Sequence, residues 1–235
     1  MKLGLIGAGM IGGTLGRLWH RAGHEVVFGT RHPESLAPLV TELRATEHGG
    51  TDSRATAGKA DMREAAGTAD ARAAAGSAEQ AAQDAEVVLL AVPLAAIPSL
   101  ASSIGPLLAG KVVIDAGNPY PQRDGDTARE ARKHPEGSSG WVASHFPDAR
   151  VVKAFNTVYF QTLLDKSKQG VEDGIGIPIA GDDDAALDLV AALVRDAGFT
   201  PVLAGELREG KRFEPGTKVY NTGMRASEVA RELGI

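Results

Sequence analysis

Three glycines near the start of the chain have the spacing of a phosphate-binding loop. Gly7, Gly9 and Gly12 follow an apolar strand expected at residues 3–6 and precede a helix expected at residues 11–21. In a G-x-G-x-x-G loop, the first glycine permits a tight turn, the second lets backbone approach a pyrophosphate, and the third lets the helix pack on the strand. The N–H groups at the start of the helix attract the same anion. We therefore predict a dinucleotide site made by Gly7, Ala8, Gly9, Met10, Ile11 and Gly12, the alternative being an ordinary glycine-rich turn.

The end of the next predicted strand carries positive charge where NAD-binding proteins usually carry a carboxylate. Residues 25–28 have the pattern of a strand, and Thr30, Arg31 and His32 follow it closely. A carboxylate at this point takes the ribose hydroxyls of NAD, whereas NADP needs room and positive charge for its 2′-phosphate. Arg31 suits a forked, charge-assisted pair with phosphate, and Thr30 and His32 offer further donors. We therefore expect NADP(H) as the cofactor, the alternative being a surface arginine in a turn.

Two further strand ends are expected at the same edge of the sheet as the glycine loop. Residues 87–92 form an apolar run that ends at Val92 and Pro93, and these two residues offer an apolar wall to a nicotinamide ring. Asn118 follows the run at residues 111–115, and its amide can bond the nicotinamide carboxamide or a substrate carbonyl. Folds of this type bind their ligands at the carboxyl ends of the strands. The alternatives are a strand that simply stops at a proline and an asparagine that caps a turn.

The run at residues 151–155 ends in the polar pair Asn156 and Thr157, which we expect to face the substrate. Lys153 within this run is either a proton donor or a solvated or salt-bridged side chain, and we favour the second interpretation. No serine–histidine–aspartate set and no paired carboxylates are visible, and the six histidines lack metal-ligand spacing. We therefore expect no metal site and no required acid–base residue, with Asn156 and Thr157 as the catalytic candidates.

Strands and helices alternate along the chain in the manner of a parallel α/β sheet. Further strands are expected at residues 175–180 and near residues 201–203, with an amphipathic helix at residues 185–197 between them. We therefore predict an α/β fold, with a Rossmann-type doubly wound, mostly parallel sheet and a small C-terminal α/β extension. Residues 1–150 are expected to form the NADP-binding core. Residues 151–235 are expected to complete the substrate crevice without folding independently.

A nine-residue alanine-rich repeat interrupts this pattern between residues 55 and 81. Alanine and polar residues bury too little apolar area to sustain a core by themselves. The period is also shorter than the roughly 20–50 residues of the usual solenoid units. We interpret residues 46–72 as a low-complexity insertion, a slipped duplication whose last copy supplies a strand near residues 72–75. The alternative is an exposed alanine-rich helix or a flexible loop.

Composition narrows the classes of partner. The chain has 235 residues, a net charge of −5 and no cysteine, so disulfides, thiolate metal sites and a basic nucleic-acid surface are not expected. No apolar run approaches the roughly 20 residues of a membrane helix, and the glycine-spaced N-terminus is unlike a cleaved signal. We expect a mature, cytoplasmic protein that acts on a small-molecule acceptor, without nucleic-acid or membrane partners. A homodimer is a hypothesis, prompted by residues 213–233, which have no evident partner in the expected sheet.

The order of these motifs resembles the NADP oxidoreductases that depend on coenzyme F-420. The motifs that carry the resemblance are the glycine loop, Gly29-Thr30-Arg31, Ala91-Val92-Pro93, Asp115-Ala116-Gly117-Asn118-Pro119 and Lys153-Ala154-Phe155-Asn156-Thr157. The chain is also similar to the cytosolic reductase domain of six-transmembrane ferric reductases, which shares the K-x-F-N pattern. By this resemblance, NADP is held by residues 8–11, Thr30 and Arg31. Val92 and Pro93 then flank the nicotinamide, and Asn156 and Thr157 line the site of a second ring.

The resemblance implies hydride transfer between NADP(H) and a second redox partner such as coenzyme F-420, FMN or FAD. In such a reaction the cofactors supply the chemistry, and the protein supplies stacking, orientation and exclusion of water. Two other functions stay open: an NADPH-dependent imine, pyrroline-carboxylate or hydroxyacid reductase, which typically continues into a long helical region, and a non-catalytic NADP-binding sensor. A flavin or ferric reductase is the nearest enzymatic rival.

Overall fold

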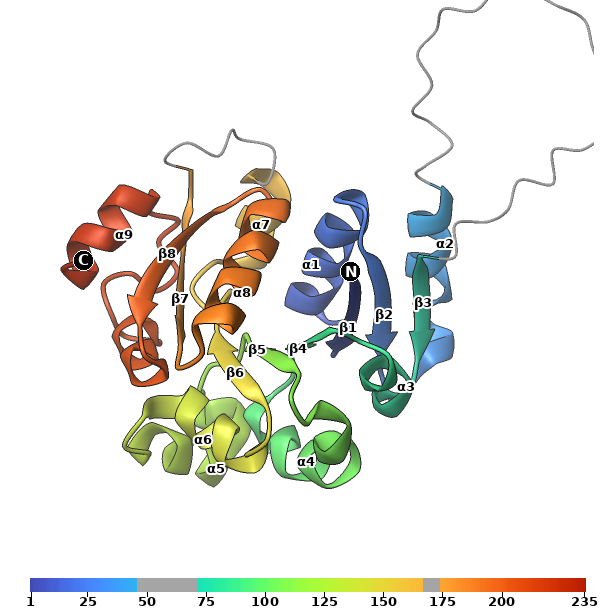
Figure 1. Cartoon of the computed structure of the whole chain (residues 1–235), viewed down its shortest axis with the longest axis horizontal. Helices are drawn as coiled ribbons and strands as arrows, with labels where there is room; N and C mark the ends of the chain where they lie inside the picture. Colours follow the sequence, from blue (N-terminus) through green and yellow to red (C-terminus); the bar gives the residue numbers. More distant parts are fainter. Residues whose placement is uncertain (46–71, 167–173) are drawn as a thin grey trace, which may run out of the picture.

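The computed structural model of the chain describes residues 1–45, 72–166 and 174–235. These residues form an eight-stranded sheet with helices on both faces (Figure 1). The strands are β1 (Lys2–Ile6), β2 (Glu25–Gly29), β3 (Ala73–Gly76), β4 (Val87–Leu90), β5 (Val112–Asp115), β6 (Arg150–Lys153), β7 (Gly176–Gly181) and β8 (Thr200–Gly205). Their order across the sheet is β3-β2-β1-β4-β5-β6-β7-β8. This arrangement confirms the predicted Rossmann-type α/β class.

The sheet is parallel from β3 to β6 and then changes direction once. β7 pairs with β6 in the antiparallel sense, with Lys153 opposite Ala180, and β8 is parallel to β7. The chain leaves β6, passes α7 (Phe160–Lys166) and enters β7 from the edge at which β6 ends. The sequence predicted a mostly parallel sheet, and this reversal is the part that strand patterns alone did not specify.

The other helices cover the two faces of the sheet. α1 (Met10–Arg21), α2 (Ala37–Ala45) and α8 (Asp184–Asp196) pack on one face, and α3 (Ala78–Gln83), α4 (Ile97–Ile104), α5 (Pro121–Lys133) and α6 (Gly137–His145) lie on the other (Figure 1). Short 3₁₀ helices occur at Pro33–Leu36, Leu94–Ala96, Gly105–Leu108 and Leu207–Phe213. The helix predicted at residues 185–197 is α8, which begins after Asp183, whose Oδ1 accepts a hydrogen bond of 2.7 Å from the Ala186 N–H.

Alternate residues of the central strands are buried in opposite faces of the sheet. Leu5 and Leu89 belong to the apolar cluster that contains residues of α1 and α8, whereas Ile6 and Leu90 belong to the cluster beneath α3 and α4. Strands that are buried on both faces need apolar side chains at nearly every position, which explains their continuous valine and leucine runs. The two clusters fix the carboxyl ends of β1, β2, β4, β5 and β6 along one edge, where the candidate site lies.

The C-terminal segment packs against the β7–β8 end of the sheet. Phe213, Val229 and Leu233 form a third apolar cluster with residues of β7 and β8, and the last two belong to α9 (Ala226–Leu233). The tail therefore has a partner within the chain, which removes the observation that prompted the homodimer hypothesis; the homodimer itself stays a prediction. The domain division at residue 150 also stays a prediction, although the sheet runs across it without a break.

The predicted insertion at residues 46–72 falls almost wholly outside the described residues. The slipped duplication and its alternative therefore stay predictions for residues 46–71. The strand expected near residues 72–75 is present one residue later, as β3, and its Ala73 lies opposite Val26 of β2 in a parallel pair.

Candidate functional site

The glycine loop joins β1 to α1, as predicted. Gly7 has a φ of +98°, which favours glycine, and a Cβ added to Gly12 would lie 1.9 Å from the Gly7 carbonyl oxygen. By contrast, a Cβ added to Gly9 would meet no atom within 4 Å. Gly9 is the N-cap residue of α1, so the open space beside it lies at the positive end of the helix dipole. Open space at the positive end of a helix is an arrangement that favours an anion.

A cavity of about 840 Å³ extends from this loop to the ends of β2 and β4. Thr30, Arg31, Val92 and Pro93 line it together with Gly7, which brings these predicted residues into one place. His32 is not among the described residues that line this cavity. Its exposed ring places Nδ1 3.3 Å from Glu34 Oε1.

Polar residues that the sequence analysis missed line the same cavity. Ser77, Ser99 and Ser103 contribute hydroxyl groups, and Glu79 contributes a carboxylate from the first turn of α3. A hydrogen bond from the Ser77 side chain lowers the pKa of Glu79, so this carboxylate is ionised at neutral pH. Among the described residues that line this cavity, the charged ones are Arg31, a cation suited to a phosphate, and Glu79, an anion suited to the N–H or hydroxyl groups of a nucleoside. The signal for Ser77 and Glu79 was the S-x-x-Q spacing of Ser77 and Gln80, a capping box that starts α3, whereas Ser99 and Ser103 lie in α4, which carries no binding motif.

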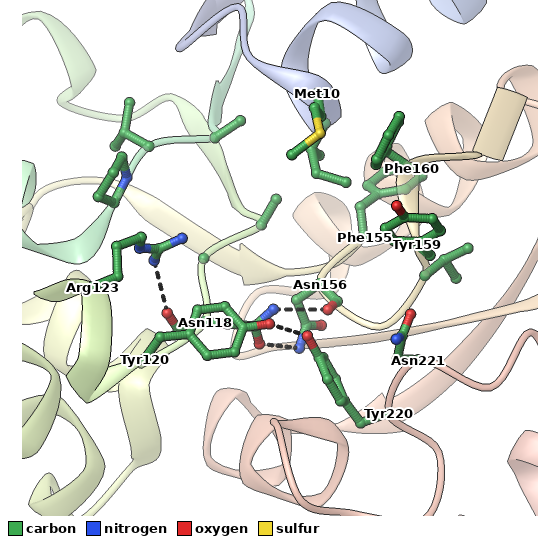
Figure 2. Close-up of a pocket in the computed structure, with 17 residues that line it drawn as sticks. Met10, Asn118, Tyr120, Arg123, Phe155, Asn156, Tyr159, Phe160, Tyr220 and Asn221 are labelled. Atoms are coloured by element: carbon green, nitrogen blue, oxygen red, sulfur yellow. Dashed lines mark hydrogen bonds between the residues drawn. The ribbon is translucent and has the colours of Figure 1, made fainter. Parts of the chain in front are cut away.

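A second cavity, of about 390 Å³, adjoins the first and shares Val92 and Pro93 with it. The labelled residues of its wall come from both halves of the chain, with Met10 on one side and Asn118, Asn156, Tyr120 and Tyr220 facing it (Figure 2). Of the 17 described residues that line it, Arg123 is the only one with a formal charge. The cavity is therefore lined mainly by apolar and aromatic residues with a few polar groups, which is typical of a small-molecule site.

Asn118 and Asn156 form a hydrogen-bonded amide pair in this second cavity. Asn118 Nδ2 donates to the Asn156 carbonyl oxygen at 2.8 Å, and Asn156 Nδ2 donates to Asn118 Oδ1 at 3.1 Å and to the Phe213 carbonyl oxygen at 3.0 Å. Because backbone carbonyls only accept, these bonds fix which end of each amide is nitrogen. Asn156 Oδ1 is left buried without a partner. A ligand that offers an N–H group would satisfy this oxygen.

The backbone around this cavity is held in an unusual conformation. Phe155 and Asn221 are the non-glycine residues with positive φ in the described part of the chain, at 62° and 56°, and both line the cavity. A bulky residue such as Phe155 adopts this region rarely and at a cost of about 1–3 kcal/mol. An edge contact with Trp19, at 5.7 Å between ring centroids, holds the Phe155 ring in the core. The turn sends the chain from β6 directly back to the cavity, which places Asn156 in its wall.

Thr157 is buried and is not among the described residues that line the cavity. Its carbonyl oxygen accepts a hydrogen bond of 2.7 Å from the Asn221 N–H, and its Oγ1 is buried without a partner. Thr157 therefore joins the end of β6 to the C-terminal segment, while Asn156 presents its amide to the cavity.

Three residues that the sequence analysis did not single out meet beside the amide pair. The hydroxyl groups of Tyr120 and Tyr220 share a hydrogen bond, although the two residues are 100 positions apart (Figure 2). The Arg123 guanidinium carbon lies 5.1 Å from the centre of the Tyr120 ring, in a cation–π contact. Arg123 also donates to the Asn118 carbonyl oxygen at 3.1 Å and to the buried Asp124 carboxylate at 2.8 Å. The signal in the sequence is that Tyr120 stands between Pro119 and Pro121, two residues after Asn118.

Lys153 is fully buried, so the expectation of a solvated side chain is wrong and that of a salt-bridged one is confirmed. Its Nζ lies 3.5 Å from Glu214 Oε1 and 3.9 Å from Asp115 Oδ2, and it donates to the hydroxyl groups of Ser138 and Ser139 at 3.0 Å each. Lys153 does not line either cavity. It therefore ties the end of β5, α6 and the C-terminal segment together behind the site, which argues against its interpretation as a proton donor to substrate.

The described residues contain neither a cluster of metal ligands nor a membrane-spanning helix. No group of three or more histidine, aspartate or glutamate side chains is placed to hold a metal ion there. None of the helices in the same residues has both the length and the apolar character that crossing a membrane requires.

Comparisons with known proteins place the chain among redox proteins. A family model described as "NADP oxidoreductase coenzyme F420-dependent" matches residues 2–119. The chain is 28% identical over 213 residues to Metalloreductase STEAP3 of Rattus norvegicus. This match covers 91% of this chain and 36% of that protein. It is 30% identical over 164 residues to the F420-dependent NADP reductase of Methanothermobacter marburgensis. This match covers 64% of this chain and 72% of that protein. The chain thus spans about a third of the length of the metalloreductase.

A solved structure matches along nearly the whole chain. The crystal structure of a hypothetical protein from Sinorhizobium meliloti has a TM-score of 0.70 and 25% sequence identity. The match covers 96% of this chain and 94% of that one, so β7, β8 and the C-terminal segment belong to the shared fold.

Proposed function

Because the chain belongs to the coenzyme F420-dependent NADP oxidoreductase family, and is an NADP-dependent oxidoreductase, we propose that it transfers a hydride between NADP(H) and a planar acceptor of the deazaflavin or flavin type. The observation that carries this proposal is the pair of adjoining cavities that share Val92 and Pro93. Two ligands that occupy these cavities would meet at the shared wall. Membership of an enzyme family sets aside the hypothesis of a non-catalytic sensor.

The first cavity fits NADP(H). The open space at Gly9 suits the pyrophosphate, and Thr30 and Arg31 suit the 2′-phosphate. Val92 and Pro93 then lie beside the nicotinamide, which supplies the hydride when the reduced cofactor is bound. Pro93 has no N–H group, so this part of the wall offers the ring an apolar surface without a competing donor.

The second cavity fits a planar heterocycle. Phe155, Phe160 and the tyrosines supply aromatic surface, and the unpartnered Asn156 Oδ1 calls for an N–H donor. Deazaflavins and flavins both have a ring N–H between two carbonyls, which matches this requirement. Asn118 holds the Asn156 amide in place through two hydrogen bonds. We therefore assign Asn156 to acceptor binding and Asn118 to its positioning, and we assign Thr157 to the support of this wall.

The proposal is tested by following NADPH oxidation with separate acceptors. We expect turnover with coenzyme F420, FMN or FAD, because these present the planar ring and N–H group that the second cavity accommodates. Ferric chelate and a cyclic imine form the two comparison arms. Turnover with only the imine would contradict the planar-acceptor proposal and favour the reductase alternative, and turnover with only ferric chelate would favour a metal reductase.

Replacing Arg31 with alanine tests the preference for NADP. We expect the Kd for NADPH to rise about 10- to 100-fold, because a charge-assisted bond to phosphate contributes roughly 1.5–3 kcal/mol. The Kd for NADH should change little, since NADH lacks the 2′-phosphate. Titration of both cofactors by fluorescence checks the result. Arg129→Ala, at an exposed arginine of α5 paired with Asp126, is the control. An equal loss of affinity for NADH and NADPH would show that Arg31 does not bind the 2′-phosphate.

A further inference from the structure

All the tyrosines of this chain gather at one place. The sequence contains three, Tyr120, Tyr159 and Tyr220, and all three line the second cavity. Tyr159 lies at its rim, half exposed, with its ring against Phe160. Tyr120 and Tyr220 lie deeper and are joined by their hydroxyl groups beside the amide pair (Figure 2).

The tyrosines are also the groups in this wall that can release a proton. Among the 17 described lining residues, the titratable side chains are the three tyrosines and Arg123, and arginine stays protonated in proteins. No histidine, lysine or carboxylate is among these 17 residues. Reduction of a planar heterocycle by a hydride leaves negative charge on the ring, and a proton transferred to the ring neutralises this charge. A proton that comes from the described wall therefore has to come from a tyrosine.

The surroundings of the pair suit this task. Arg123 places its cation over the Tyr120 ring, where it stabilises negative charge that develops on the phenolic oxygen. Asp124 orients the guanidinium through hydrogen bonds to Nε and Nη2, and its own side chain is fully buried. Burial and the hydrogen bond with Tyr120 raise the pKa of Tyr220 well above its usual range. Tyr220 therefore keeps its proton at neutral pH and can donate to Tyr120, which leaves the Tyr120 O–H free to point into the cavity.

We propose that Tyr120 is the proton donor to the reduced acceptor and that Tyr220 relays its replacement proton from solvent. This inference rests on the proposed function. The acceptor gains one hydride, which carries both electrons, as NADPH becomes NADP⁺. The O–H bond of Tyr120 breaks as its proton moves to the acceptor ring, the Tyr220 proton moves to Tyr120, and a proton from water restores Tyr220. The same path runs backwards when the acceptor is oxidised.

The relay predicts different defects in the two phenylalanine variants. Tyr120→Phe should slow the first turnover by about 100-fold or more, because general acid catalysis contributes roughly 10²–10⁴-fold. Tyr220→Phe should spare the first turnover and slow the later ones, since Tyr120 still holds one proton but is refilled slowly. The rates are measured in H₂O and in D₂O with whichever of F420, FMN and FAD the wild-type protein reduces. Tyr159→Phe, which removes a hydroxyl from the same wall, should retain the wild-type solvent isotope effect.

A second measurement does not depend on activity. Because no other tyrosines exist in the chain, the ultraviolet absorbance of tyrosinate reports on this cavity alone. In the Tyr159→Phe background, Tyr220 should ionise at a pH above that of an ordinary tyrosine. Burial, the larger cause of the raised pKa of Tyr220, remains when Tyr120→Phe is added, but the hydrogen bond with Tyr120 is lost, so the pKa of Tyr220 should fall part of the way towards its usual value. The NADPH Kd of each variant confirms that the first cavity is intact.

The outcomes separate this inference from the function on which it rests. If the wild-type protein reduces a planar acceptor and Tyr120→Phe does so at the same rate with the same isotope effect, the tyrosine relay is wrong and the proposed function stands. An unchanged Tyr220 titration on removal of the Tyr120 hydroxyl would also overturn the relay. If the wild-type protein reduces none of the three planar acceptors, both proposals fall.

Discussion

Replacing Lys153 with methionine is expected to lower the free energy of unfolding by about 3–5 kcal/mol, because removal of one partner strands the other charges of a buried ion pair. Methionine keeps most of the side-chain volume, so the loss reports on charge. Asp115 and Glu214 would remain, and both are largely shielded from water. The melting temperature should fall by roughly 6–20 °C for a chain of this size. Chemical and thermal denaturation measure both quantities.

Two further variants distinguish the effect of lost charge on stability from the effect of lost packing. Lys218→Ala removes an exposed lysine that pairs with Glu232 and should leave the melting temperature unchanged. Adding Glu214→Gln to Lys153→Met should recover part of the stability, because one stranded carboxylate becomes neutral. A double variant as unstable as the sum of its single changes would show that Lys153 and Glu214 do not interact.

The loss of Lys153 should also weaken the binding of the acceptor in the second cavity. Glu214 accepts hydrogen bonds from the Ser138 N–H and hydroxyl, at 3.0 and 2.6 Å, so it fastens the segment that leads to Tyr220. The neighbouring Phe213 carbonyl oxygen accepts from Asn156 Nδ2. At temperatures where the variant is still folded, acceptor affinity should therefore fall more than NADPH affinity.

The cofactor half of the site follows from local sequence. The glycines at positions 7, 9 and 12 act within a few residues of one another, and the strands that precede each predicted residue are continuous apolar runs. Thr30, Arg31, Val92 and Pro93 therefore reach one cavity as expected, since parallel strands bring their carboxyl ends to one edge. Motifs of this kind can be placed from the sequence because the residues that form each of them are close together in the chain.

The acceptor half depends on contacts between distant residues. Tyr220 and Asn221 line the cavity in a structure where β7 runs antiparallel to β6 and Glu214 meets Lys153, and neither pairing leaves a periodic trace in the sequence. The same contact explains why Lys153 is buried although strand alternation allowed a solvated position. The tyrosine pair was missed for this reason, since Tyr120 has no evident role until Tyr220 is placed beside it.

The third glycine of the loop gives the second large effect, because Gly12→Ala is expected to abolish tight NADPH binding. A Cβ there would lie 1.9 Å from the Gly7 carbonyl oxygen, so the loop and the start of α1 must move apart. A displacement of about 1 Å at a binding loop costs on the order of 100-fold or more in function. The variant should also melt at a lower temperature without any ligand, since the clash exists in the free protein.

Gly9→Ala separates the close approach of a ligand from the packing of the protein. Gly9 has a φ of −70°, which any residue adopts, and a Cβ there meets no atom of the chain within 4 Å. The variant should therefore keep the wild-type melting temperature and lose NADPH affinity, because the new methyl group occupies the space that the pyrophosphate needs. Gly105→Ala, at another glycine with open space around its Cβ, should change neither property. Calorimetric titration and thermal melting of the three variants check this pattern, and wild-type NADPH affinity in Gly9→Ala would show that the pyrophosphate binds elsewhere.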